Sequence, residues 1–201
     1  MHDTVLYAIT DLGDSALMLP LAVALAVALW SQQSGAAALT WLGTLLPGLA
    51  AITALKLAGH TCEAALANPS LVSPSGHAAF ATMVYGSAGV IAARHLGGVA
   101  RGLAVAVPAG VIAAVAATRL LLGLHSGLEV AIGLTIGAIS VALFAQRYRT
   151  LPPAAFRSRR AGMLLAGAVL LLVALHGERL HAEELIRTIA LGLRSQVSVC
   201  R

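Results

Sequence analysis

The 201-residue sequence contains few charged residues: Asp, Glu, Lys and Arg make up 10% of it, whereas 59% is hydrophobic. Between Ser15 and Leu55 the sequence has no Asp, Glu, Lys or Arg. So little polar material argues against a soluble globular domain of this size. A helix that crosses a bilayer needs roughly 20 apolar residues, and several segments reach that length. We therefore expect an integral membrane protein with several spanning helices.

Other patterns are missing as well. The apolar runs are continuous and rich in Ala and Leu, without the alternation that a membrane β-barrel requires. The first residues carry Asp3, Asp11 and Asp14 and no basic cluster, so we expect no signal peptide. Cys62 and Cys200 match no metal or redox motif, and a disulfide between them stays open. The basic residues lie between helices, so the net charge of +5 does not indicate nucleic-acid binding.

The apolar pattern predicts an all-α membrane helix bundle with about six transmembrane helices, forming a single domain over residues 1–201. Gly123 fits the position after a helix end, where a left-handed residue stops the helix. The tail, 177–201, has the spacing of an amphipathic helix, and we expect it on the membrane surface. The six predicted helices cover roughly residues 15–30, 38–56, 75–94, 102–122, 125–146 and 161–176.

The distribution of charge predicts the orientation in the membrane. Arg94 and Arg101 flank one link between helices, and five arginines occur between residues 147 and 160. The positive-inside rule places both links in the cytoplasm. The loop after residue 56, the turn before residue 125 and the tail then face outward. Trp30 and Trp41 flank the remaining inner link, where we expect them at the membrane interface.

The residues suited to chemistry occur in three outward-facing places, which alternation puts at one membrane depth. A helix N-terminus with glycine binds phosphate through its free N–H groups and dipole. Lysine and arginine add positive charge. A carboxylate one helical turn from an imidazole accepts a proton from one ring nitrogen and leaves the other basic and nucleophilic. The three places hold Lys56; Ser75, Gly76 and His77; and Arg119, His125 and Glu129.

Pro74-Ser75-Gly76-His77 followed by Arg119-x5-His125-x3-Glu129 resembles the second and third motifs of the type 2 phosphatidic acid phosphatase family, the membrane lipid phosphatases. The resemblance implies that His125 attacks phosphorus and forms a phosphohistidine, that Glu129 orients it, and that His77 protonates the leaving group. It also implies that Lys56, Ser75, Gly76 and Arg119 hold the phosphate. It implies no metal and no other cofactor.

Three positions depart from the family pattern. The family's first motif is Lys-x6-Arg-Pro, but that spacing after Lys56 reaches Glu63-Ala64, so one phosphate ligand is missing. His60 is a possible substitute, although a solvated position in the loop is the simpler reading of both His60 and Glu63. Thr118 replaces the usual serine, and Glu129 replaces aspartate, which lengthens the side chain by one methylene.

The sequence therefore predicts a membrane phosphatase acting on a lipid phosphate or pyrophosphate: undecaprenyl pyrophosphate, phosphatidate or phosphatidylglycerol phosphate. Its partners would be this substrate and the surrounding lipids, in a bacterial inner membrane with the site facing the periplasm. Three alternatives remain: a lipid phosphotransferase, a non-catalytic lipid-phosphate carrier or scaffold, and a metal hydrolase built on His77, His125 and Glu129. Each motif residue also has a simpler interpretation, as a helix cap, an interfacial ion pair or a membrane anchor. Gly133 and Gly137 suggest close helix packing.

Overall fold

The computed structural model describes residues 2–62, 73–152, 158–178, 180 and 182–194. Its regular structure over these residues is helical, which confirms the predicted all-α fold. The first elements are short: α1 (His2–Thr10) and the 3₁₀ helix η1 (Asp11–Gly13). The others are α2 (Ser15–Gln32), α3 (Gly35–Thr61), α4 (Gly76–His95), α5 (Gly98–Leu121), α6 (Gly127–Thr150), α7 (Ser158–Leu175) and α8 (Ala182–Arg194).

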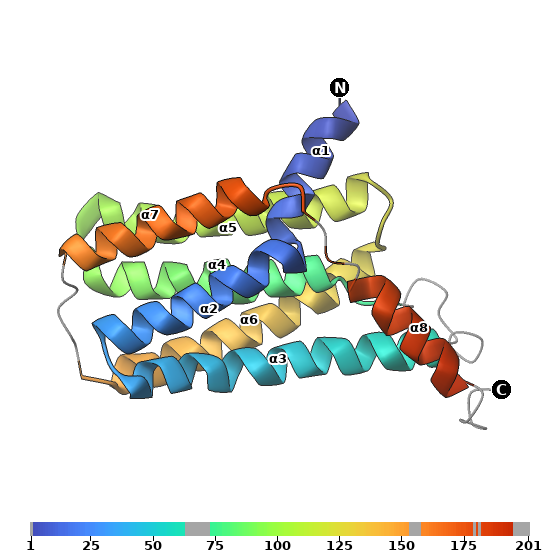
Figure 1. The fold of residues 1–201 in the computed structure, drawn as a ribbon, viewed down its shortest axis with the longest axis horizontal. Helices are drawn as coiled ribbons and strands as arrows, with labels where there is room; N and C mark the ends of the chain where they lie inside the picture. Colours follow the sequence, from blue (N-terminus) through green and yellow to red (C-terminus); the bar gives the residue numbers. More distant parts are fainter. Residues whose placement is uncertain (1, 63–72, 153–157, 179, 181, 195–201) are drawn as a thin grey trace.

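Helices α2 to α7 run side by side along the long axis of the molecule (Figure 1). Helix α4 packs against α2, α5 and α6. Most of its buried residues lie in its N-terminal half. Helix α1 points away from one end of the bundle, and α8 lies against α3 at that same end (Figure 1). The bundle therefore has one end to which both terminal helices belong.

Four stretches within the described residues are long and apolar enough to cross a membrane: Thr4–Gln32, Gly35–Thr61, Gly98–Leu121 and Gly127–Thr150. Large apolar side chains are exposed along them, as a lipid-facing surface requires. The structure thus supports a membrane protein, while the number of about six spans stays a prediction. Helix α4 is not among these four stretches, and the neighbouring helices α5 and α6 pack against it.

The predicted helices all occur, with ends shifted by a few residues. Gly123 has φ +63° directly after α5, which confirms it as the helix-stopping residue. Two differences bear on the site. Helix α3 continues past Lys56 to Thr61, and α1 with η1 was not predicted because these segments are short and carry acidic residues.

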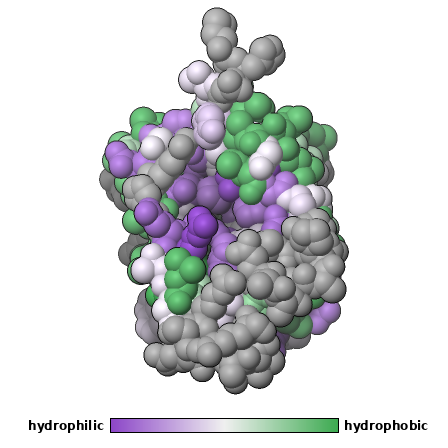
Figure 2. All heavy atoms as spheres, turned by 90° about the vertical axis from the view of Figure 1, so that its right-hand side faces the viewer, coloured by the Kyte–Doolittle hydropathy of each residue, from purple (hydrophilic) through white to green (hydrophobic). Residues whose placement is uncertain are grey.

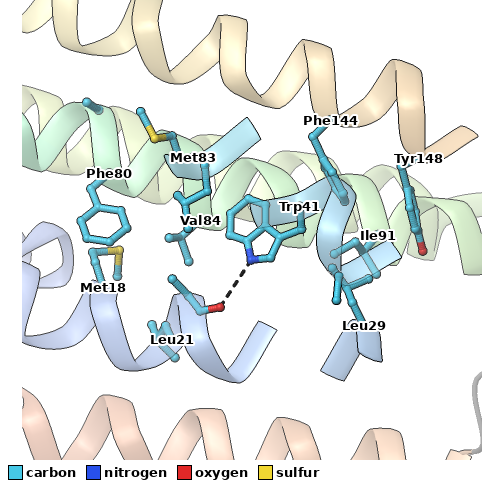
Figure 3. Packing of buried hydrophobic residues seen from close by; sticks show 14 of the residues in the cluster. Met18, Leu21, Leu29, Trp41, Phe80, Met83, Val84, Ile91, Phe144 and Tyr148 are labelled. Carbon is cyan, nitrogen blue, oxygen red and sulfur yellow. Dashed lines mark hydrogen bonds between the residues drawn. The ribbon is translucent and has the colours of Figure 1, made fainter. Parts of the chain in front are cut away.

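The prediction for Trp41 was wrong. Its side chain is fully buried, and its indole contacts Phe144 edge-to-face, with ring centroids 5.6 Å apart (Figure 3). Phe144 in turn stacks on Tyr148 at 5.0 Å. The indole Nε1 donates to the carbonyl oxygen of Ala22 at 3.4 Å, which gives the buried donor a partner. Trp41 therefore belongs to the core, whereas Trp30 is exposed as an interfacial residue would be.

The two arginine-rich links meet at the end of the bundle where α4 and α6 finish. Arg94 donates to the carbonyl oxygens of Tyr148 and Leu151, at 2.6 Å for Leu151. Its guanidinium also lies 4.6 Å from the centre of the Tyr148 ring. Both basic links thus lie at the same end of the helix bundle, as the positive-inside argument requires. The N-termini of α4 and α6 lie at the opposite end of the bundle.

Candidate active site

Hydrophilic side chains gather in the centre of the end to which α1 and α8 belong (Figure 2). Here the start of α4 meets the start of α6. The backbone N–H of Ser75 donates to the carbonyl oxygen of Glu129, with an N···O distance of 3.0 Å. A Cβ at Gly133 would lie 2.4 Å from the Ser75 carbonyl oxygen, so a side chain there would separate the helices. Gly133 therefore lets the second and third motifs approach, which confirms its predicted role in close helix packing. Gly137 has the same role, since a Cβ there would lie 2.5 Å from the Cβ of Thr82.

Ser75 caps α4 and is completely buried. Its side-chain oxygen accepts a hydrogen bond from the Ala78 N–H at 3.4 Å. Gly76 is the first residue of α4, and a Cβ there would lie 3.3 Å from Cε of Lys56. The helix N-terminus, with its positive dipole end, thus lies directly beside the lysine side chain.

Lys56 is buried where α3 passes the start of α4. Its ammonium group donates to the hydroxyl of Ser73 at 3.0 Å and forms an ion pair with Glu183 of α8. His60, one turn further along α3, lies 3.0 Å from the same carboxylate. The expectation that His60 is a solvated loop residue was wrong, because α3 extends to Thr61 and turns His60 towards α8.

His125 lies in the turn between α5 and α6. After Gly123 reverses the chain, the backbone N–H of His125 donates to the Arg119 carbonyl oxygen at 3.2 Å. Its Nδ1 lies 3.1 Å from Oε2 of Glu129. Because the carboxylate only accepts, we assign the proton to Nδ1, which leaves Nε2 as the basic nitrogen. Burial, the charge of Arg119 and the charge of Lys56 lower the pKa of His125, although Glu129 opposes them.

Glu129 holds three groups at once. Oε2 also accepts the Ser126 N–H at 3.0 Å, which completes a capping box at the start of α6. Oε1 accepts the Ser73 N–H at 2.6 Å. The longer side chain that departs from the family's aspartate therefore still reaches His125, while it also fixes the segment before α4.

His77 lies in the first turn of α4, and its partner was missed by sequence reasoning. Its Nε2 is 3.4 Å from Oδ2 of Asp14. The other oxygen of Asp14 caps α2 through the Ala16 N–H at 2.8 Å and accepts the Leu180 N–H at 3.1 Å. Gly13 permits this approach, since a Cβ there would lie 3.2 Å from the His77 Cβ. Asp14 carries the signal of a helix cap, but no local pattern links it to residue 77.

Arg119 is the remaining predicted phosphate ligand. It is buried in the last turn of α5, and its Nη1 donates to the Thr10 hydroxyl at 3.2 Å. Its charge acts electrostatically on both His77 and His125, as does that of Lys56. The neighbouring Thr118 hydroxyl turns back to the Val115 carbonyl oxygen of its own helix at 2.7 Å. The two imidazoles therefore share the same pair of cations.

The structure brings all seven predicted residues to one end of the bundle, and it adds Asp14, Ser73 and Glu183. Glu63 lies outside the described residues, so the departure in the first motif has no structural account. Cys62 is disulfide-bonded, and Cys200 lies outside the described residues. Within the described part of the chain, no group of three or more His, Cys, Asp or Glu side chains has the arrangement of a metal site.

The family model of the PAP2 superfamily matches residues 53–152, about half of the chain, from just before Lys56 to beyond Glu129. Neither the curated proteins nor the solved structures gave a significant match. Membership of this family indicates phosphatase activity on phosphate esters. The chain belongs to the PAP2 superfamily, that is, the type 2 phosphatidic acid phosphatases that its second and third motifs resemble.

Proposed function

We propose that this protein is an integral membrane phosphatase that hydrolyses a lipid phosphate or pyrophosphate through a phosphohistidine at His125. The contact between His125 Nδ1 and Glu129 Oε2 carries the proposal, because it leaves Nε2 unprotonated. The lowered pKa of His125 supports this, since a neutral imidazole is the nucleophile. The α4 N-terminus and two cations supply an anion site beside it.

In the first step, Nε2 of His125 attacks phosphorus and the bond from phosphorus to the leaving oxygen breaks. Glu129 stabilises the imidazolium charge that develops on the ring. Lys56, Arg119 and the N–H groups at the start of α4 stabilise the charge on the phosphoryl oxygens. His77 gives its proton to the leaving oxygen, so the lipid alcohol, or the lipid monophosphate from a diphosphate, departs with that oxygen protonated.

In the second step, water attacks the phosphohistidine. His77, which lost its proton in the first step, accepts one from this water and so acts as the general base. The bond between phosphorus and Nε2 breaks, and inorganic phosphate is released with His125 restored. Asp14 pairs with His77 on the side of α2 and supports its charged form in both steps.

The site lies at the end of the bundle opposite the arginine-rich links. A helix terminus at headgroup level lets a phosphate enter while its hydrocarbon chain stays in the bilayer. The positive-inside rule supports an outward-facing site, which in a bacterial inner membrane is the periplasmic side. Undecaprenyl pyrophosphate, phosphatidate and phosphatidylglycerol phosphate are the substrates that this location suits.

A non-catalytic carrier or scaffold is the second candidate, because Lys56 is already paired with Glu183. Phosphate release from purified protein, with a panel of lipid phosphates and diphosphates, separates the two. We expect His125→Ala to abolish release, and His176→Ala, which changes an exposed imidazole beyond α7, to preserve it. The phosphoenzyme should be trapped at alkaline pH in the parent protein alone. Release that survives His125→Ala would contradict the proposal.

A further inference from the structure

The tail helix α8 inserts a carboxylate next to the proposed phosphate site. Glu183 forms an ion pair with Lys56, accepts a hydrogen bond from the Ser73 hydroxyl at 2.8 Å and lies 3.0 Å from His60. Three partners from two segments hold it, so its position is fixed by more than one contact. Helix α8 itself packs along α3, which supports the arrangement.

Glu183 is the more exposed partner of its ion pair with Lys56. The Lys56 side chain is 5% exposed, whereas that of Glu183 is 52% exposed. A phosphate that binds to Lys56 therefore lies close to the Glu183 carboxylate. Burial alone would raise the pKa of Glu183, but Lys56, His60 and Ser73 lower it to about 2. The group is therefore negatively charged at any working pH.

The first-motif spacing adds to this effect, because it reaches Glu63-Ala64 where the family pattern has a second cation. The first motif thus has one cation fewer than the family pattern, and Glu183 places a negative charge beside the lysine of that motif. Glu183 then repels every additional negative charge on a substrate headgroup, and the first motif supplies no arginine to offset this repulsion.

We propose that Glu183 is a specificity-determining residue that makes the site favour lipid phosphomonoesters over the more highly charged lipid diphosphates. The proposal rests on the proposed phosphatase function and narrows its substrate class. One extra unit charge about 6 Å from a partly solvated carboxylate corresponds to about threefold to tenfold discrimination. The carboxylate acts through charge and does not touch the reacting atoms.

The test compares a prenyl monophosphate with the diphosphate of the same chain length, which keeps the hydrocarbon constant. Glu183→Gln removes the charge and keeps the shape. We expect it to raise kcat/KM for the diphosphate about threefold to tenfold more than for the monophosphate, mainly through KM. Glu184→Gln is the matched control: it makes the same change at the next position, whose side chain is exposed. It should leave the ratio unchanged.

An equal change for both substrates, or a loss with both, would overturn the proposal and make Glu183 a structural contact. A binding measurement separates this result from failure of the proposed function. In the His125→Ala background, added Glu183→Gln should increase thermal stabilisation by inorganic pyrophosphate more than by inorganic phosphate. If no lipid phosphate is hydrolysed and this difference still appears, the phosphatase proposal fails and the charge-selection proposal stands. If the difference is absent, the charge-selection proposal fails.

Discussion

The backbone N–H of Ser75 donates to the carbonyl oxygen of Glu129, and this single 3.0 Å bond joins two motifs that lie 54 residues apart in the sequence. Ser75 caps the helix whose N-terminus we propose as the phosphate site. Glu129 orients the imidazole that we propose as the nucleophile. This contact between the start of α4 and the start of α6 therefore couples the proposed anion site to the proposed nucleophile.

The charge of Glu129 should be essential to catalysis. Glu129→Gln keeps the size of the side chain, but its amide can donate to Nδ1 of His125 and favour the wrong tautomer. We expect kcat to fall on the order of 10²- to 10⁴-fold. Glu129→Asp, the residue of the family pattern, should retain more activity than Glu129→Gln. Circular dichroism and thermal melting check that the bundle is intact; equal activity of Glu129→Gln and the parent would exclude the orienting role.

The acidic limb of the pH–rate profile should report on His125. Burial and the charges of Arg119 and Lys56 lower its pKa below the ordinary value of 6.5, so the nucleophile stays neutral into mildly acidic solution. Arg119→Gln removes one of these charges, which makes protonation easier and raises that pKa. We therefore expect the acidic limb of kcat/KM to move to higher pH, in addition to a lower maximum rate. An unshifted or oppositely shifted limb would contradict the electrostatic coupling of Arg119 to His125.

Asp14 should matter most for substrates with a poor leaving group. Asp14→Asn removes the carboxylate that lies 3.4 Å from Nε2 of His77. The protonated form of His77, which we propose as the proton donor, then loses the negative charge that stabilises it. We expect a large loss of kcat with lipid alcohols as leaving groups and a much smaller loss with an aryl phosphate, which needs little protonation. His77→Ala should show the same pattern. Glu178→Gln, a change at an exposed carboxylate, serves as the control and should show neither loss.

The helices and the convergence of the seven motif residues could be predicted because both depend on local signals. Apolar length gives the helices, and alternation across the membrane gives each motif its end of the bundle. Gly123 was predictable for the same reason, since a left-handed residue after a helix is a local requirement.

The contacts missed by sequence reasoning all depend on tertiary packing. Asp14 reads as an ordinary helix cap, and only the packing of η1 on α4 brings it to His77. Glu183 reads as one of several acidic residues in the tail until α8 packs on α3. Trp41 follows the inner link as Trp30 precedes it, but the packing of α3 against α6 turns the Trp41 side chain into the core. These three pairings, Asp14 with His77, Lys56 with Glu183 and Trp41 with Phe144, join residues from 63 to 127 positions apart, beyond the range of any periodic pattern.

Gly133 provides a test of the packing that builds the site. Gly133→Ala would put a Cβ 2.4 Å from the Ser75 carbonyl oxygen, which neither backbone can avoid without α4 and α6 separating. We expect a loss of about 1–3 kcal/mol in stability from this overpacking, and a larger proportional loss of phosphate release because the Ser75–Glu129 bond would lengthen. Gly110→Ala on α5 is the matched control: a Cβ there meets no atom within 4 Å, so alanine should be neutral or slightly stabilising. Melting temperature and phosphate release, measured on both variants, separate the two effects. If Gly133→Ala were as stable and active as Gly110→Ala, the close contact between the two motifs would not be what positions the site.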